Sequence, residues 1–503
     1  MRPRGWQNLP AKVYFGIFGC AIAVFVWQFR LRFPFDDTFI SFRYAEHLAS
    51  GHGLVWNIVG PYTEGYTNFL FVLLLAALRF FTHDLLAAAQ IIGLLSTVLT
   101  GLLLYSIARS WRNPSVGILA TLLYFAAPLT WINALNGMET SVFVFFCVSS
   151  IALFIKRPRL AFFFALLATL TRPEAAMLAA IALLVQYFKS PSKKSLLTEF
   201  TLFYLFPLAL YLVWKYYYFG FLLPNSFYVK VLEPGHTLAP GLQYVRLFLI
   251  STIALLIASF GIWRRISAST LVIAALWAIG LVTFYIFVRP LEGLYDRFLW
   301  PAFVMLCLMA SAGLLDFTER FGNRVFLVCS LLLLAANTFV MIHSPRTEQS
   351  LAAHEEVWDA NMDHIVSELK LLPHFDSLTL GYGDAGYVVY KSGIRHLDLV
   401  GLNDTRIAHA GSLQERANVV LSEHPDVLLL PATSTDSCYH LVEDAYGLAQ
   451  TNLFTPTASL DAFPYRLVLY VNPRSPYAAG LQSYVEHRMH DSHNFLQPSP
   501  CLQ

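Results

Sequence analysis

The chain has 503 residues, of which 56% are hydrophobic, 15% aromatic and only 13% charged, and its mean hydropathy is +0.55. Soluble domains carry about 25% charged residues. The composition therefore excludes a water-soluble globular protein and predicts a chain embedded in a lipid bilayer. The 34 basic and 32 acidic residues leave a net charge of +2. This nearly neutral balance argues against nucleic-acid binding, which requires a concentrated positive surface.

Eleven apolar stretches are interpreted as membrane spans within a domain of residues 1–343. A span needs about 20 apolar residues, although shorter ones occur. The first stretch, residues 13–29, has no small-residue cleavage site, so it is interpreted as an uncleaved span and not a signal peptide. The other ten are residues 85–108, 115–132, 140–155, 160–170, 175–188, 200–218, 244–263, 270–288, 298–317 and 325–343.

The connections between these stretches predict the orientation, because short cytoplasmic loops carry an excess of Lys and Arg. With eleven spans, the N-terminal segment and five connections, all rich in Lys and Arg, fall on one side. Two segments decide this count. Residues 68–81 are too short to span and favour an interfacial helix, and the proline and charges of Thr171-Arg172-Pro173-Glu174 favour a turn between two short spans. We therefore expect a cytoplasmic N-terminus and a C-terminal segment outside the cytoplasmic membrane.

The composition changes after residue 343, where charges, histidines and prolines become frequent. Residues 344–503 are predicted to form an extracytoplasmic α/β domain, with a helix over residues 354–371. Strands are predicted at 377–380, 387–390, 427–430 and 466–471, each near turn-forming residues. Whether Cys438 and Cys501 form a disulfide is left open.

The first outer loop, residues 33–84, begins with the adjacent carboxylates Asp36 and Asp37. Neighbouring like charges raise each other's pKa, so one of the two acids could accept a proton near neutral pH. Two alternatives stay open at this point. The pair could help to hold a divalent cation such as Mg²⁺ or Mn²⁺, or it could cap a helix at the membrane surface.

Several motifs in order along the chain resemble bacterial GT-C membrane glycosyltransferases. Within that superfamily they are most similar to LphB-type proteins and to the terminal β-arabinofuranosyltransferases of cell-wall assembly. Asp36-Asp37-Thr-Phe-Ile-Ser-Phe-Arg43-Tyr44-Ala and Glu64-Gly65-Tyr66-Thr67-Asn68 carry the resemblance most clearly. Further matching pieces are Gly137-Met138-Glu139-Thr140, Thr171-Arg172-Pro173-Glu174, Pro224-Asn225-Ser226-Phe-Tyr228-Val-Lys230, Arg297-Phe-Leu-Trp300-Pro301, Gly383-Asp384-Ala385-Gly386 and Asp398-Leu-Val-Gly401-Leu402-Asn403-Asp404.

The resemblance implies an inverting sugar transfer from a polyprenyl-phosphate donor to a glycan or lipid acceptor at the outer face of the membrane, in cell-envelope polysaccharide assembly. It implies that Asp36 is the general base and that Asp37 orients it or binds a cation. An alternative from another class is a transporter or flippase for a lipid-linked glycan, which usually shows repeated halves and ionisable residues near the bilayer midplane. No repeat is visible here.

The leaving lipid phosphate requires positive charge nearby, and the expected topology places three basic residues at outer span ends. These are Lys230 and Arg172, which are ranked first as phosphate ligands, and Arg297. Each has an alternative role, because Arg172 could pair with Glu174, Lys230 could be an interfacial anchor, and Arg297 could pair with Asp296. The predicted substrate-binding set also contains Arg43, Glu64, Tyr66, Glu174 and Asn225.

Overall fold

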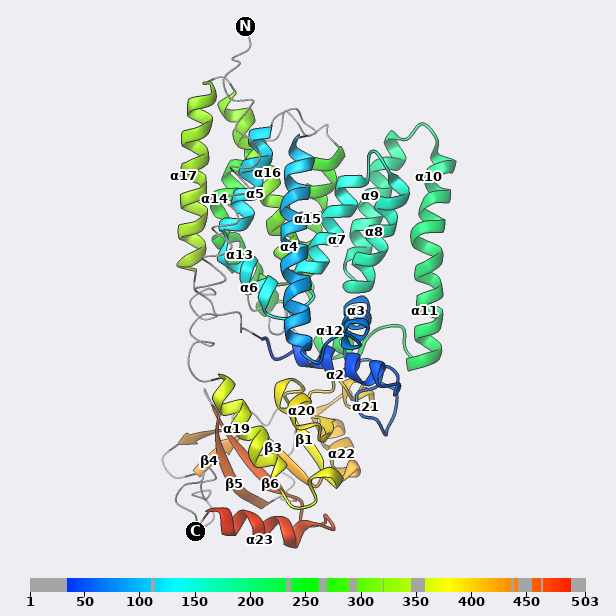
Figure 1. Cartoon of the computed structure of the whole chain (residues 1–503), viewed down its shortest axis with the longest axis vertical. Helices are drawn as coiled ribbons and strands as arrows, with labels where there is room; N and C mark the ends of the chain where they lie inside the picture. The colour runs from blue at the N-terminus through cyan, green and yellow to red at the C-terminus, as the bar shows by residue number, and fades with distance from the viewer. Residues whose placement is uncertain are drawn as a thin grey trace.

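The computed structural model describes residues 34–109, 114–231, 237–261, 269–288, 296–319, 321–344, 358–435, 438–441, 455–462 and 465–489. A bundle of apolar helices forms one end of the molecule and an α/β domain forms the other (Figure 1). The predicted first span, residues 13–29, lies outside the described residues, as does Cys501 of the suggested disulfide.

Each of the other ten predicted spans contains a helix or a bent helix pair. The bundle consists of α4 (Leu85–Arg109), α5 (Pro114–Ala126), α6 (Pro128–Leu135), α7 (Thr140–Leu153), α8 (Pro158–Thr171), α9 (Ala175–Lys189), α10 (Lys193–Phe200), a π-helical turn (Thr201–Leu205), α11 (Phe206–Phe219), α13 (Ala239–Ser251), α14 (Ile253–Ser259), α15 (Ser269–Phe287), α16 (Trp300–Thr318) and α17 (Asn323–Ile342). Five of the described helices are long and apolar enough to cross a membrane, or up to seven if each bent pair is one span. The total of eleven stays a prediction.

Two local predictions in this part of the chain are confirmed. α8 ends at Thr171 and α9 begins at Ala175, because Pro173 cannot continue the helix and its ring disfavours helical geometry in the residue before it. Phe69–Arg79 forms the short helix α3 of 11 residues. α3 packs on α2 (Thr38–Ala49), and both lie where the bundle meets the C-terminal domain (Figure 1).

The C-terminal domain contains a mixed sheet in the order β2-β1-β3-β6-β5, with β4 paired to β3. Its strands are β1 (Thr379–Tyr382), β2 (Arg395–Asp398), β3 (Val427–Thr435), β4 (Cys438–Leu441), β5 (Thr455–Ala462) and β6 (Tyr465–Val471). β1 is parallel to β2 and β3, whereas β6 is antiparallel to β3 and β5. The predicted strands at 377–380, 427–430 and 466–471 correspond to β1, β3 and β6.

The predicted strand at 387–390 was wrong, because these residues begin helix α20 (Tyr387–Ser392). A run of four apolar residues is compatible with a buried strand and with a buried helical turn, and its spacing does not distinguish them. Gly393 ends the helix in a left-handed conformation, with φ of 76°. The sequence prediction also missed β2, β4 and β5.

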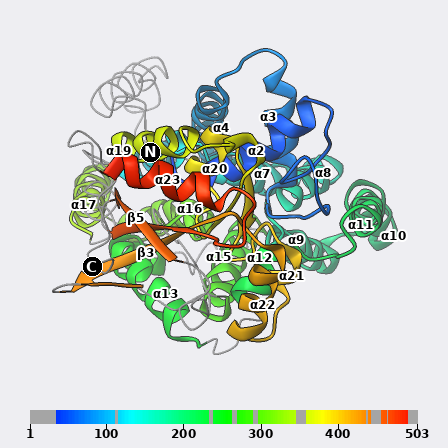
Figure 2. The ribbon, with the colours of Figure 1, turned by 90° about the horizontal axis from the view of Figure 1, so that it is seen from below.

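Alternate residues of β3 point to opposite faces of the sheet, as strand geometry requires. Val427 and Leu429 join a core with α19 (Trp358–Lys370) and α23 (Ala478–Met489), whereas Leu428 and Leu430 pack toward α22 (Leu413–Glu423). In Figure 2, which views the molecule from below, α19 and α23 overlap in projection, whereas Figure 1 shows α23 at the far end of the C-terminal domain and α19 nearer the bundle. The first of these cores continues without a break into α2 and α3, so apolar packing joins the two domains.

Candidate active site

A cavity of about 290 Å³ lies where the bundle meets the C-terminal domain, because residues of α2 and Leu402 of the C-terminal domain both line it. Its polar lining combines acids and bases from distant parts of the chain: Asp37, Glu64, Glu139, Arg172, Glu174, Lys215, Lys230 and Arg297. Apolar residues of α11 and α15, among them Leu208, Leu212 and Phe284, line another part of it. The cavity therefore offers a charged region and an apolar region to one ligand.

Asp37 and Arg297 form an ion pair in this cavity, with 2.7 Å between Asp37 Oδ2 and Arg297 Nη2. The Arg297 side chain is only 3% exposed, whereas that of Asp37 is 23% exposed. Nε and Nη1 of Arg297 are buried and have no hydrogen-bond partner. Buried N–H donors are costly to leave unpaired, so these two atoms are suited to an anionic ligand. Arg297 is therefore paired with Asp37, and not with Asp296 as the alternative in the sequence analysis had it.

The turn that carries Arg297 is built just before α16. Asp296 has a φ of 50°, an uncommon backbone conformation for a residue other than glycine. Its carbonyl accepts a hydrogen bond from the Leu299 amide at 2.9 Å. The guanidinium of Arg297 also lies over the rings of Phe35 and Phe298, at 4.7 and 4.8 Å from their centroids. These contacts hold the cation in place.

Asp36 and Asp37 face different partners although they are adjacent. Oδ1 of Asp36 accepts a hydrogen bond from the backbone N–H of Tyr387 in the C-terminal domain, at 2.8 Å, and Asp36 does not line the cavity. Burial, together with the nearby carboxylate of Asp384 and, to a smaller extent, that of Asp37, raises the pKa of Asp36 to about 8. The expected rise in pKa is therefore present, but burial is its main cause. Asp37 occupies the N-cap position of α2, as the helix-cap alternative expected, but its side chain makes no capping hydrogen bond.

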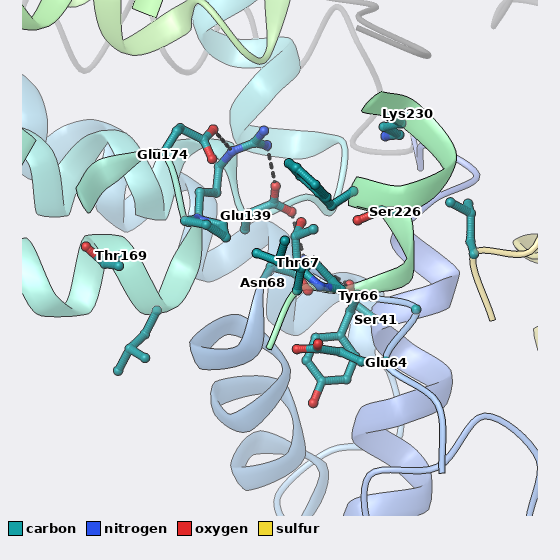
Figure 3. A pocket seen from close by; sticks show the side chains of 18 of the residues that line it. Ser41, Glu64, Tyr66, Thr67, Asn68, Glu139, Thr169, Glu174, Ser226 and Lys230 are labelled. Atoms are coloured by element: carbon teal, nitrogen blue, oxygen red, sulfur yellow. Dashed lines mark hydrogen bonds and ion pairs between the residues drawn. The ribbon is translucent and has the colours of Figure 1, made fainter. Parts of the chain in front are cut away.

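Arg172 is held between the carboxylates of Glu139 and Glu174, and Figure 3 shows Glu174 across the view from Lys230. Nη1 of Arg172 lies 2.7 Å from Glu139 and its Nε lies 2.6 Å from Glu174. Tyr285 donates a hydrogen bond to Glu174 at 2.7 Å, and Asn68 donates one to Glu139 at 2.9 Å. Arg172 is thus engaged by acids, and this group of one cation and two carboxylates is better suited to sugar hydroxyls than to a phosphate.

The remaining predicted residues of the cavity come from the first outer loop and from α12 (Asn225–Val231). Glu64 forms a buried ion pair with Lys215 at 2.8 Å, and burial raises the pKa of Glu64 to about 7 despite the opposing effect of Lys215. The hydroxyl of Tyr66 is buried without a hydrogen-bond partner. Lys230 lies 5.8 Å from the ring centroid of Phe298, so Lys230 and Arg297 share one aromatic neighbour.

Two predicted substrate-binding residues do not line the cavity. The guanidinium of Arg43 is buried and donates to the carbonyls of Trp56, Val389 and Ile394 and to the side chain of Asn57. Asn225 donates from its side chain to Thr405 Oγ1 at 3.3 Å. Both residues instead help to join the membrane domain to the C-terminal domain, Arg43 through Val389 and Ile394 and Asn225 through Thr405.

Sequence reasoning did not include Lys215 or Tyr285 among the site residues. Lys215 carried a usable signal, because a lone lysine within a long apolar helix usually has a functional or structural partner. Tyr285 carried none, since tyrosine is common in apolar helices and only its contact with Glu174 marks it.

The contacts of the acidic pair do not fit a divalent cation. Among the described residues, no group of three or more His, Cys, Asp or Glu side chains is arranged to hold a metal ion. Asp37 pairs with a guanidinium and Asp36 accepts from a backbone amide, so the two carboxylates do not converge on one point.

Comparisons with known proteins found a match for part of the C-terminal domain and a structural similarity over most of the chain. Residues 365–470 match a domain of unknown function (DUF8728). The search of curated proteins gave no match. The structure of ArnT from Cupriavidus metallidurans bound to undecaprenyl phosphate is similar over 92% of this chain and 98% of that chain, with a TM-score of 0.59 and 12% identity. The same protein in the apo state gives a TM-score of 0.54 and 13% identity over the same shares.

An oligosaccharyltransferase from Archaeoglobus fulgidus, tethered to an acceptor peptide, is similar over 92% of this chain and 74% of that chain, with a TM-score of 0.54 and 12% identity. These neighbours are GT-C glycosyltransferases. The fold is the GT-C fold. The similarity extends over most of the chain, including both the helical bundle and the C-terminal domain. At these identities it identifies the fold alone, so the LphB-like and arabinofuranosyltransferase-like specificity stays a prediction.

Proposed function

We propose that this protein is an inverting glycosyltransferase of the cytoplasmic membrane that uses a polyprenyl-phosphate sugar as donor. The observation that carries this proposal is the cavity in which two buried, unpartnered N–H groups of Arg297 lie beside an apolar lining. A lipid phosphate combines an anionic head with an apolar chain. The GT-C fold, which a neighbour bound to undecaprenyl phosphate shares, supports the same ligand class.

The phosphate would bind at Arg297, with Lys230 adding positive charge from α12. A guanidinium fork can make two parallel hydrogen bonds to phosphate oxygens. Arg172 is less suited to this role because Glu139 and Glu174 already neutralise it. This reverses the order expected from the sequence, in which Lys230 and Arg172 came before Arg297.

The sugar would then lie toward Glu139, Glu174 and Tyr66, whose oxygen atoms can accept or donate hydrogen bonds to hydroxyl groups. The apolar residues of α11 and α15 would contact the start of the polyprenyl chain. This arrangement uses the charged and apolar regions of the cavity for one amphipathic donor.

In the transfer step, the acceptor oxygen forms a bond to the anomeric carbon as the bond from that carbon to the phosphate oxygen breaks. The bonding electron pair leaves with the phosphate, whose developing charge Arg297 stabilises. The acceptor proton passes to the carboxylate of Asp36. An inverting attack comes from the face opposite the leaving group, so the acceptor would approach Asp36 from outside the donor cavity, which Asp37 lines and Asp36 does not.

The proposal is tested by incubating purified protein with a radiolabelled polyprenyl-phosphate sugar and a cell-envelope glycan or lipid extract. We expect label in the extract and release of polyprenyl phosphate in equal amounts. A flippase would instead move the intact lipid between leaflets of a vesicle without cleaving it, and that result would reject the enzyme. Mass spectrometry of co-purifying lipids identifies which sugars to test first.

A further inference from the structure

A segment of the C-terminal domain is packed directly against the carboxylate of Asp36. The N–H of Tyr387 donates to Asp36 Oδ1 at 2.8 Å. Gly386, the preceding residue, has no room for a side chain, because a Cβ there would overlap both carboxylate oxygens of Asp36. The two residues are 350 and 351 positions away along the sequence, so this contact exists only when the two domains are assembled.

Contacts on both sides hold this segment in place. Before it, the hydroxyl of Tyr382 donates to Asp384 Oδ2 at 2.9 Å. After it, Arg43 of α2 donates to the carbonyl of Val389 at 2.8 Å. The ring of Phe39, the second residue of α2, meets the ring of Tyr387 edge to face with 4.9 Å between centroids. The segment is therefore fixed relative to the same helix that follows Asp36.

We infer that Gly386 and the backbone N–H of Tyr387 are positioning residues for Asp36, so that the C-terminal domain completes the catalytic motif of the membrane domain. The inference rests on the proposed function. A base must hold its carboxylate in one direction to take the acceptor proton, and an adjoining amide donor with a closely packed glycine restricts that direction. Proximity to Asp384 and burial at this contact also suit a base that is partly protonated near neutral pH.

The test uses the full-length protein and the substitution Gly386→Ala, which forces the Asp36 carboxylate or the segment to move. We expect kcat to fall about 10²-fold, as misplacement of a reacting group by about 1 Å does, without a matching rise in KM for the donor. The matched control is Gly480→Ala in α23, where an added Cβ meets no atom within 4 Å. It should leave kcat and KM unchanged.

A second measurement does not depend on activity. Gly386→Ala should lower the thermal unfolding temperature in the wild-type background and lower it much less beside Asp36→Ala, because the overlapping carboxylate is then absent. If Gly386→Ala folds only in the Asp36→Ala background, the inference is supported. If it fails to fold in both backgrounds, or lowers the unfolding temperature equally in both, the contact is not specific to Asp36 and the inference is rejected.

The outcomes also separate this inference from the proposed function. A wild-type protein that transfers sugar, with a Gly386→Ala variant that retains kcat, overturns the inference alone. A wild-type protein that transfers no sugar overturns the proposed function and the inference together. A fall in kcat with an unchanged donor KM supports both.

Discussion

The guanidinium of Arg297 pairs with Asp37 through one nitrogen and keeps two other buried nitrogen atoms, Nε and Nη1, without hydrogen-bond partners. Asp37 neutralises the cation enough for it to be buried at 3% exposure. The unpaired nitrogens remain free to bind an anion. This geometry makes Arg297 the first residue to test for donor binding.

Arg297→Gln should weaken binding of polyprenyl phosphate roughly ten- to a hundredfold, because a charge-assisted hydrogen bond contributes about 1.5–3 kcal/mol. Arg297→Lys should retain part of the affinity, since it keeps the charge and loses the fork. Binding is measured by competition with a labelled polyprenyl-phosphate sugar. Arg79→Gln is the control, because Arg79 pairs with Glu46 outside the cavity. Unchanged affinity in Arg297→Gln would place the phosphate elsewhere.

Asp36→Asn should lower the rate of sugar transfer by about 10²–10⁴-fold while leaving donor affinity close to wild type, because a general base acts in the chemical step. Asp37→Asn should change both the rate and the donor affinity, because Asp37 sets the position of Arg297. Steady-state transfer and equilibrium donor binding are measured for both variants. A fully active Asp36→Asn protein would falsify the assignment of the base.

The raised pKa of Asp36 predicts opposite pH trends for activity and stability. Activity requires the ionised base, so kcat/KM should rise with pH and level off above about 8. The folded state favours the protonated carboxyl, so its contribution to stability is complete below the ordinary pKa of 3.8 and is lost as the pH rises toward 8. The difference in unfolding temperature between wild type and Asp36→Asn, measured from pH 5.5 to 8.5, should follow this trend. A difference that does not vary with pH contradicts it.

Lys215→Met should destabilise the protein by about 3–5 kcal/mol, because it leaves the buried Glu64 carboxylate without its cation. The double variant Lys215→Met with Glu64→Gln should recover much of that loss, since no unpaired charge is left behind. Unfolding is followed in detergent for both single variants and the double variant. If the changes in the free energy of unfolding of the two single variants add up to that of the double variant, Glu64 and Lys215 do not stabilise each other.

The membrane topology is tested with reporter fusions. A fusion after Lys194, in the connection between the sixth and seventh predicted spans, should report the cytoplasm, and a fusion after residue 350 should report the outside. This follows from the basic residues that the eleven-span count places on one side. The same location for both fusions would reject the count and move Arg172 away from the proposed active face.

The local features of the bundle were predictable because they depend on neighbouring residues. Pro173 between two charged residues indicated where α8 ends and α9 begins. The length of residues 68–81 indicated a short helix, which is α3. The run at 387–390 was misassigned because its local pattern is ambiguous, and the terminating Gly393 was the more informative residue.

Composition and apolar periodicity were sufficient to predict an apolar helical bundle and a separate α/β domain. The sequence motifs also indicated a group of acidic and basic residues to test. They could not determine which of Asp36 and Asp37 lines the cavity, or that Arg43 joins the domains. Those outcomes depend on partners far away in sequence: Arg297 lies 260 residues from Asp37, and Tyr387 lies 351 residues from Asp36. Ion pairs and hydrogen bonds require atoms within about 3 Å, and only the tertiary fold, which brings the turn before α16 and helix α20 against the start of α2, places these atoms together.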